Sequence, residues 1–250
     1  MKPTRTSRIT LLLLLVACGA GAQSIGLNPQ QVSMSLNLQG GSFTRAVNIF
    51  LLVTALSLVP GFIIMMTSFT RIVVVLGFLR QAMGTQNSPS GRIISGLALF
   101  LTIFIMHPVW TEVYQEAVVP FSEKTMTQDA AMARAAIPIK RFMLSQTRDS
   151  SLIMFMDIAQ LPPVAGPADL PLKVIVPAFM VSELQTAFQM GFLIFLPFLV
   201  IDIVTATFLM SMGMMMLPPM MISLPFKLLL FIIADGWNLI IGGLVKSFAY

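Results

Sequence analysis

Charged side chains are scarce in this sequence. Aspartate, glutamate, lysine and arginine make up 10% of the 250 residues, whereas hydrophobic residues make up 56%. Ordinary soluble domains carry about 25% charged residues. This composition excludes a typical soluble protein and predicts a membrane protein.

The sequence also has few residues that could carry reactive chemistry. It contains one cysteine, Cys18, and one histidine, His107. Glu112 lies five residues beyond His107 and across a proline, which does not match a metal site or an acid–base pair. The sequence has no glycine-rich phosphate loop of the Walker or dinucleotide type. We therefore predict no enzyme activity, no metal and no cofactor.

The first 22 residues have the layout of a cleaved signal peptide. Three basic residues (Lys2, Arg5 and Arg8) precede the apolar run 9–17, and Ala20 and Ala22 supply small residues for cleavage after Ala22. Removing these three of the 15 basic residues leaves 12 against 10 acidic ones, so no nucleic-acid partner is expected.

Cys18 leaves an alternative processing route open. Leu15 to Cys18 also resembles the lipobox at which bacterial lipoproteins are cut and acylated on cysteine. With the signal peptide removed after Ala22, the mature chain would contain no thiol.

The rest of the chain divides by composition into four parts. Residues 23–44 are polar and predict a flexible arm. Residues 45–109 predict a first apolar helical hairpin, residues 110–173 a small helical domain outside the bilayer, and residues 174–250 a second apolar hairpin with a methionine-rich loop. The expected fold class is therefore an all-α membrane-associated protein, in which long kinked apolar helices form hairpins and a helical insert is extracytoplasmic.

Some boundaries inside the apolar segments can be predicted and others cannot. Pro60-Gly61 predicts a kink in the first helix. The 44 residues from Val174 to Leu217 fit either one long helix kinked near Pro197 or two crossings. The segment Ile222–Val245 predicts one final helix.

The insert is expected on the outer face of the membrane. The leader would export the N-terminus, and two crossings in residues 45–109 would then return the chain outward before residue 110. Within the insert, residues 139–161 have a periodicity that suits an amphipathic helix.

Ionisable residues inside the apolar segments are candidate functional residues. A charge at membrane depth costs at least about 2.5 to 3.5 kcal/mol unless it is paired or wet. We therefore expect a partner or a water-filled lining for each of five residues: Arg71, Glu183, Asp202, Lys227 and Asp235.

Two of these residues belong to polar stripes at helical spacing. Ser182, Gln185 and Gln189 lie beside Glu183, and the series Asp235, Asn238, Gly242 repeats that spacing in the last segment. Such stripes face protein or water rather than lipid. They indicate either contacts between helices, within or between subunits, or an ion pathway.

Three long motifs resemble the FliP family, the flagellar export-gate subunit whose relatives in virulence secretion are called SctR. They are "MMTSFTRIVVVLGFLRQAMGTQ" (65–86), "PAFMVSELQTAFQMGFLIFLPFLVIDIV" (177–204) and "MGMMMLPPMMISLPFKLLLFIIADGWNLI" (212–240). They occur in the family's order, and the resemblance covers residues from about 45 to 248.

The resemblance implies an assembly in the bacterial inner membrane, at the flagellar basal body. Five copies would form a pore-forming cone with FliQ and FliR, work with FlhA and FlhB, and pass unfolded flagellar proteins. It also implies an ion pair between Glu183 and Lys227 on neighbouring helices, and places Asp202 and Asp235 in subunit contacts.

The methionine-rich loop is the predicted pore seal. Residues 210–221 contain seven of the 20 methionines and no charge, and methionine is flexible and polarizable. The predicted sealing residues are Met210, Met212, Met214, Met215 and Met216. Gly213 fits a flexible turn, and Pro218-Pro219 would stop the preceding helix. The same methionines could instead only fill the turn between two helices.

Two other functions fit parts of the sequence. Methionine-rich runs can offer soft ligands to Cu(I), which would suit a copper transporter, although no cysteine or histidine joins the cluster and the 60-residue insert would be unexplained. A membrane scaffold without a conduit is the second alternative.

Overall fold

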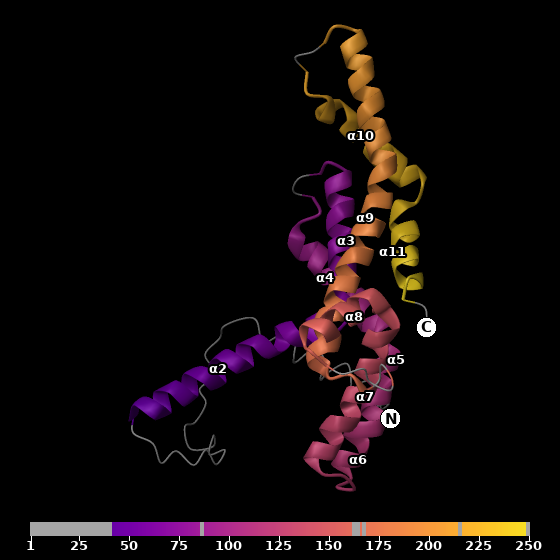
Figure 1. Cartoon of the computed structure of the whole chain (residues 1–250). Helices are drawn as coiled ribbons and strands as arrows, with labels where there is room; N and C mark the ends of the chain where they lie inside the picture. Colours follow the sequence, from indigo (N-terminus) through magenta and orange to yellow (C-terminus); the bar gives the residue numbers. More distant parts are fainter. Residues whose placement is uncertain (1–41, 86–87, 162–165, 167–168, 215–216, 249–250) are drawn as a thin grey trace, which may run out of the picture. The chain divides into compact units, whose positions relative to one another are not determined.

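The computed structural model describes residues 42–85, 88–161, 166, 169–214 and 217–248, and these form helices and short connections without a β-strand (Figure 1). The prediction of an all-α fold is confirmed. The predicted signal peptide, almost all of the predicted arm, Met215 and Met216 lie outside the described residues. The chain divides into two compact units, residues 1–53 and 54–250.

The helices follow one another with short connections. Their order and bounds are α2 (Ser42–Met65), α3 (Phe69–Ala82), α4 (Gly91–Ile105), α5 (His107–Val113), the π-helix η2 (Tyr114–Val118), α6 (Val119–Ser122), α7 (Gln128–Gln146), α8 (Asp149–Ile158), α9 (Leu172–Ser211), α10 (Pro219–Ile233) and α11 (Gly236–Lys246).

The first break between helices lies beyond the predicted kink at Pro60-Gly61. Helix α2 continues through Pro60-Gly61, and the chain leaves the helix only at residues 66–68. A threonine and a serine lie at this break, and the Thr67 hydroxyl donates to the Ile64 carbonyl at 2.7 Å. Such side-chain bonds compete with the helical ladder.

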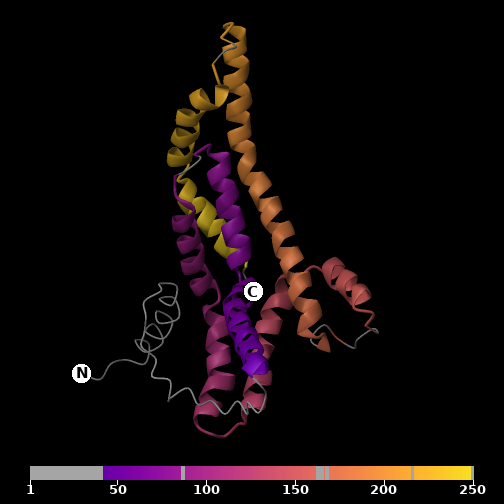
Figure 2. The ribbon, with the colours of Figure 1, turned by 90° about the vertical axis from the view of Figure 1, so that its left-hand side faces the viewer.

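Helix α9 is the central element of the second unit. It packs against α3, α7, α8 and α10, and Figure 2 shows it as the longest helix. Its 40 residues include Pro177 and Pro197, so Val174–Leu217 contains one long helix rather than two crossings. At 1.5 Å per residue such a helix is about 60 Å long, twice the hydrocarbon thickness of about 30 Å.

The packing of α3 on α9 forms the main core. The large apolar side chains that α3 buries completely are Ile72, Val75, Leu76 and Leu79. They recur at i, i+3, i+4 and i+7, which places them on one helix face. The buried residues of α9 have a similar spacing. They include the apolar side chains of Ile175 and Phe179 and, further along the helix, the polar side chains of Ser182 and Glu183. The core stripe of α9 therefore leads into a buried polar site.

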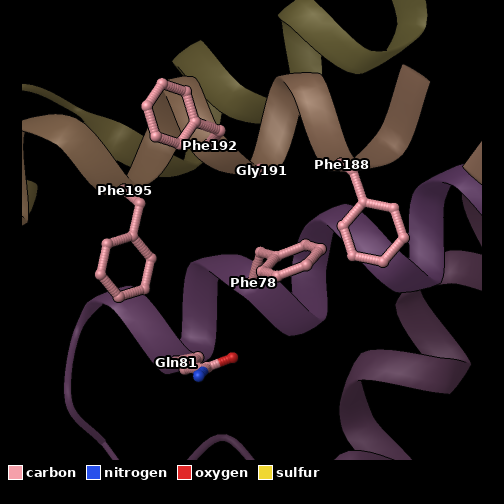
Figure 3. A pocket seen from close by; sticks show the side chains of 6 residues that line it. All are labelled: Phe78, Gln81, Phe188, Gly191, Phe192 and Phe195. Atoms are coloured by element: carbon pink, nitrogen blue, oxygen red, sulfur yellow. The ribbon is translucent and has the colours of Figure 1, made fainter. Parts of the chain in front are cut away.

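The two helices approach closely at Gly191. Phe78 of α3 lies against this glycine, with Phe188 and Phe195 of α9 on either side (Figure 3). A Cβ atom at position 191 would lie 2.5 Å from Cδ2 and 3.0 Å from Cβ of Phe78. The Phe78 and Phe188 rings meet edge to face with centroids 5.3 Å apart. Glycine at this position is required by the space that Phe78 takes.

The insert contains several short helices rather than one long amphipathic helix over 139–161. Helix α7 ends at Gln146, and Thr147 and Arg148 have extended backbones before α8 begins at Asp149. The helices α5, η2 and α6 pack on α7, while α7 and α8 both contact α9. Phe142 of α7 and Phe179 of α9 lie edge to face, 5.9 Å apart.

The predicted final helix, Ile222–Val245, is wrong as a single helix. It is divided into α10 and α11, whose axes differ by 64°. Asp235 has a left-handed backbone with φ of 48°, and the Phe231 ring lies so close to Gly236 that a Cβ atom there would be 2.2 Å from it. The left-handed residue ends α10, since a right-handed helix cannot continue through it.

One helix among the described residues, α9, is long and apolar enough to cross a membrane by itself. Two bent pairs pass the same test only when each is taken as one span: α4 with the segment His107–Ser122, bent by 55°, and α10 with α11. The described part of the chain therefore holds between one and three candidate spans.

Candidate functional site

A buried cation joins three helices and the C-terminal segment. Arg71 of α3 is 3% exposed and donates from Nε to Oε2 of Glu183 at 2.8 Å, with a second bond from Nη2 to Oε1. Nη2 also donates to Gln146 Oε1 at 3.1 Å, and Nη1 donates to the carbonyl and hydroxyl of Ser247. The guanidinium carbon lies 3.8 Å from the centroid of the Phe248 ring.

This arrangement is a bidentate pair held in a fully desolvated site. Glu183 is 0% exposed, and its two oxygens both accept from Arg71. The planar guanidinium matches a carboxylate in this geometry, and its remaining donors find neutral acceptors. The site can fix the positions of α3, α7, α9 and the C-terminal end, but it offers no acid or base to a substrate.

A second buried charge lies near the other end of α3. Lys227 of α10 donates from Nζ to Oδ2 of Asp202 at 2.6 Å and to the carbonyl of Ala82 at 3.1 Å. Ser223 donates to Oδ1 of Asp202 at 2.6 Å. The side chains of Lys227 and Asp202 are 4% and 28% exposed. The cation therefore joins the C-terminal end of α3 to both arms of the α9–α10 hairpin.

The predicted ion pair between Glu183 and Lys227 is not formed within the chain. Each residue has a different partner: Glu183 pairs with Arg71, and Lys227 pairs with Asp202. The sequence identified the four charged residues that form these two ion pairs. It did not identify the pairs, because the spacing of residues along one helix does not show which other helix packs against it. The pairing is set by the order in which α3 and α10 pack on α9.

The methionine-rich segment forms the connection at the tip of the α9–α10 hairpin. Helix α9 ends in a Schellman motif: the Met214 amide donates to the Leu209 carbonyl, and the Gly213 amide donates to the Met210 carbonyl, both at 3.0 Å. Gly213 has φ of 74°, which a glycine adopts without strain. Helix α10 then begins at Pro219.

The prolines therefore have a different role from the one predicted. Helix α9 ends at Ser211, well before Pro218-Pro219, so glycine and not proline terminates it. Pro219 is the first residue of α10, where its missing amide hydrogen costs nothing. The tip is a loop with a defined backbone at both ends.

The tip methionines are exposed, and an apolar cavity adjoins them. Met210 and Met212 are 57% and 58% exposed, and Met214 is 41% exposed. The cavity between α9 and α10 has a volume of about 640 Å³. Its wall is almost entirely apolar and is made by Val200, Ile201, Val204, Thr205, Phe208, Leu209, Met212, Met214, Ile222 and Phe226. The Thr205 hydroxyl already donates to the Ile201 carbonyl at 2.6 Å.

Comparison with known families matches residues 52–244 to the FliP family model, over more than half of the chain. The chain belongs to the FliP family. Curated relatives are named flagellar biosynthetic protein FliP. The one from Pectobacterium carotovorum subsp. carotovorum is 47% identical over 98% of this chain and 94% of its own. The Bacillus subtilis (strain 168) protein is 52% identical over 82% and 93%, and the Caulobacter vibrioides protein is 46% identical over 98% and 91%.

In this FliP-family chain the polar stripe of α9 contacts the insert. The backbone amide of Arg148 donates to Ser182 Oγ at 3.1 Å. The Arg148 side chain donates from Nη2 to Gln189 Oε1 at 2.7 Å and to Thr186 Oγ1 at 3.4 Å. The two ends of the stripe, Ser182 and Gln189, therefore contact the insert, while Gln185 between them is exposed. Sequence reasoning missed Arg148 itself. The cluster of threonine, aspartate and serine around it, typical of a helix start, was the available signal.

The remaining candidates do not join these clusters. Asp235 is exposed, and it accepts from Asn238 Nδ2 at 2.7 Å beside the bend between α10 and α11. Its place in a subunit contact stays a prediction. His107 is exposed at the start of α5, and no group of three His, Cys, Asp or Glu residues in the described part of the chain could hold a metal ion.

Proposed function

We propose that this chain is a pore-forming subunit of the flagellar type III protein export gate, and that it passes unfolded flagellar proteins across the bacterial inner membrane. Family membership supports the flagellar role. The observation that carries the pore role is the exposed, uncharged methionine tip on a hairpin whose two arms are joined by the buried Lys227–Asp202 pair.

The tip has the properties of a deformable seal. A methionine side chain has several rotatable bonds and can fill irregular gaps, so copies of the tip from neighbouring subunits can close a constriction without a fixed shape. An apolar ring excludes water and ions by dewetting. It can still part around a polypeptide of any sequence, because no charge or hydrogen bond between subunits has to be broken.

The proposal includes the assembly that the resemblance to the FliP family implies. Five copies of this chain would form the pore with FliQ and FliR, next to FlhA and FlhB in the flagellar basal body. The exposed apolar surface of α9 and α10, which includes Phe208, Phe226 and Leu229, supports contacts with lipid or other subunits.

Replacing Met214, Met215 and Met216 with alanine is expected to make the resting complex leak. Alanine is too short to fill the constriction, whereas leucine at the same positions keeps most of the apolar volume. We expect ion flux through reconstituted complexes to rise on the order of tenfold for the alanine variant, since a dewetted barrier is lost, and little for the leucine variant.

A matched control is Met132→Ala in α7, because Met132 is 66% exposed but lies outside the tip. Its flux should equal that of the unaltered complex. Protein export by the alanine variant should fall less than sealing does. Unchanged flux in a correctly assembled alanine variant would rule out the seal.

The proposed orientation places the insert helices α5 to α8 on the periplasmic side. A membrane-impermeant maleimide should label a cysteine introduced at exposed Met132 in intact cells, and a cysteine at exposed Lys124 should react similarly. Labelling only after the inner membrane is opened would reverse the orientation.

A further inference from the structure

The described methionines differ widely in exposure, and five of the exposed ones lie close together in the sequence. Those flanking the hairpin tip are open to solvent: Met210, Met212, Met214, Met220 and Met221, of which Met221 is 71% exposed. By contrast, Met106 and Met143 are 0% exposed in the core. Five accessible thioethers therefore lie within residues 210–221. None of the described methionines in this range is buried.

We propose that these tip methionines are a modification site for two-electron oxidants such as hypochlorous acid, and that their oxidation opens the resting pore. The second part rests on the proposed function, and the first part does not. Susceptibility follows exposure, so the tip is the part of the hairpin where oxidation occurs first.

The reaction is a simple oxygen transfer to sulfur. The thioether sulfur gives an electron pair to the oxygen of hypochlorous acid, an S–O bond forms, the O–Cl bond breaks, and chloride and a proton leave. The sulfur is oxidised to the sulfoxide and the chlorine is reduced. A methionine sulfoxide reductase with a thiol reductant reverses the change.

The product has the opposite effect on water from that of the thioether. A sulfoxide is polar and accepts hydrogen bonds, so it can hold water in a ring that was apolar. The local chain offers it little internal compensation: the cavity wall beside Met212 and Met214 is almost entirely apolar, and its Thr205 hydroxyl is already used. The oxidised tip is therefore hydrated, and dewetting no longer closes the pore.

The first measurement maps the chemistry. The purified full chain in detergent, not assembled with other copies, is treated with increasing hypochlorous acid, digested, and analysed for sulfoxide at each methionine by mass spectrometry. We expect Met210, Met212, Met220 and Met221 to oxidise at least about ten times faster than Met106 and Met143, as exposure dictates. Equal rates in the two groups would overturn the proposed site whether or not the tip seals a pore.

The second measurement tests the consequence with two matched variants. In one, the tip methionines are replaced with leucine, which is apolar and is not oxidised. In the other, Met132→Leu removes an equally exposed methionine from α7. Ion flux through reconstituted complexes should rise several-fold on oxidation of the unaltered and Met132→Leu complexes, stay low in the tip variant, and fall again after treatment with the reductase.

The outcomes separate the two proposals. Sulfoxide at the tip without a rise in flux would overturn the gating effect, while leaving the alanine test of the seal to stand by itself. A rise in flux in the oxidised leucine variant would place the sensitive group elsewhere. A third outcome is that the alanine variant does not leak and that the unaltered complex keeps a low ion flux when its tip is fully oxidised. This result would show that the proposed seal is wrong and that the proposed oxidation site is right.

Discussion

Replacing either Arg71 or Glu183 with alanine is expected to destabilise the fold by about 3 to 5 kcal/mol, because each change strands the other member of a buried pair. Arg71 cannot lose its charge, although it would keep Gln146, Ser247 and Phe248 as neighbours. Glu183 would keep no other hydrogen-bond partner among the described residues, although it can take up a proton. We expect the unfolding midpoint in detergent to fall on the order of 10 °C for either variant.

The double variant Arg71→Met with Glu183→Leu is the informative comparison. It removes both charges and their desolvation cost, so it should lose less stability than either single alanine variant. The exposed pair of Arg141 and Glu112, joined at 3.0 Å, is the matched control. Breaking it should change stability by less than about 1 kcal/mol. Additive losses for Arg71 and Glu183 would show that the two residues act independently.

Lys227→Met is expected to destabilise the α9–α10 hairpin by about 2 to 4 kcal/mol. This loss is somewhat smaller than that from breaking a fully buried ion pair, because Asp202 is partly open to solvent and keeps its hydrogen bond from Ser223. The same change frees the arm that carries one side of the methionine tip. We therefore expect less assembled complex and an ion leak in the complex that does assemble.

Asp202→Asn separates charge from geometry at this site. Asparagine keeps an acceptor for Lys227 or Ser223 but leaves the more deeply buried ammonium unbalanced, so its effect should be at least as large as that of Lys227→Met. Co-purification yield and ion flux, measured together, test this order. A Lys227→Met complex that assembles in normal amounts and stays sealed would contradict a role for the pair in positioning the tip.

The sequence predicted the all-α fold class and the charged residues that need partners, because both depend on local composition. Charge scarcity indicated a membrane protein, and the cost of a charge in an apolar segment identified Arg71, Glu183 and Lys227 as residues that need partners. Each of these three is buried against an opposite charge in the structure. The partners could not be predicted, since they belong to helices more than 20 residues away along the chain.

Breaks in the helices were harder to predict than the helices themselves. Pro60-Gly61, Pro177 and Pro197 all lie inside continuous helices, so proline was a poor guide here. The bend after α10 occurs at an aspartate in a left-handed conformation, held by Asn238 and by the Phe231 ring over Gly236. An intrinsic preference of aspartate is too weak to predict this against an apolar run on both sides.

The bend at Asp235 also limits where lipid can lie. In α11 the first hydrogen bond from an amide to the carbonyl four residues earlier is the one from Leu239 to Asp235. The amides of Gly236, Trp237 and Asn238 therefore have no helical hydrogen bond of this kind. Hydrocarbon cannot solvate bare peptide groups, each of which costs several kcal/mol there. The hydrophobicity of residues 222–245 therefore does not make them a span that lipid can cover along its whole length: their midpoint must touch headgroups, water or another polypeptide.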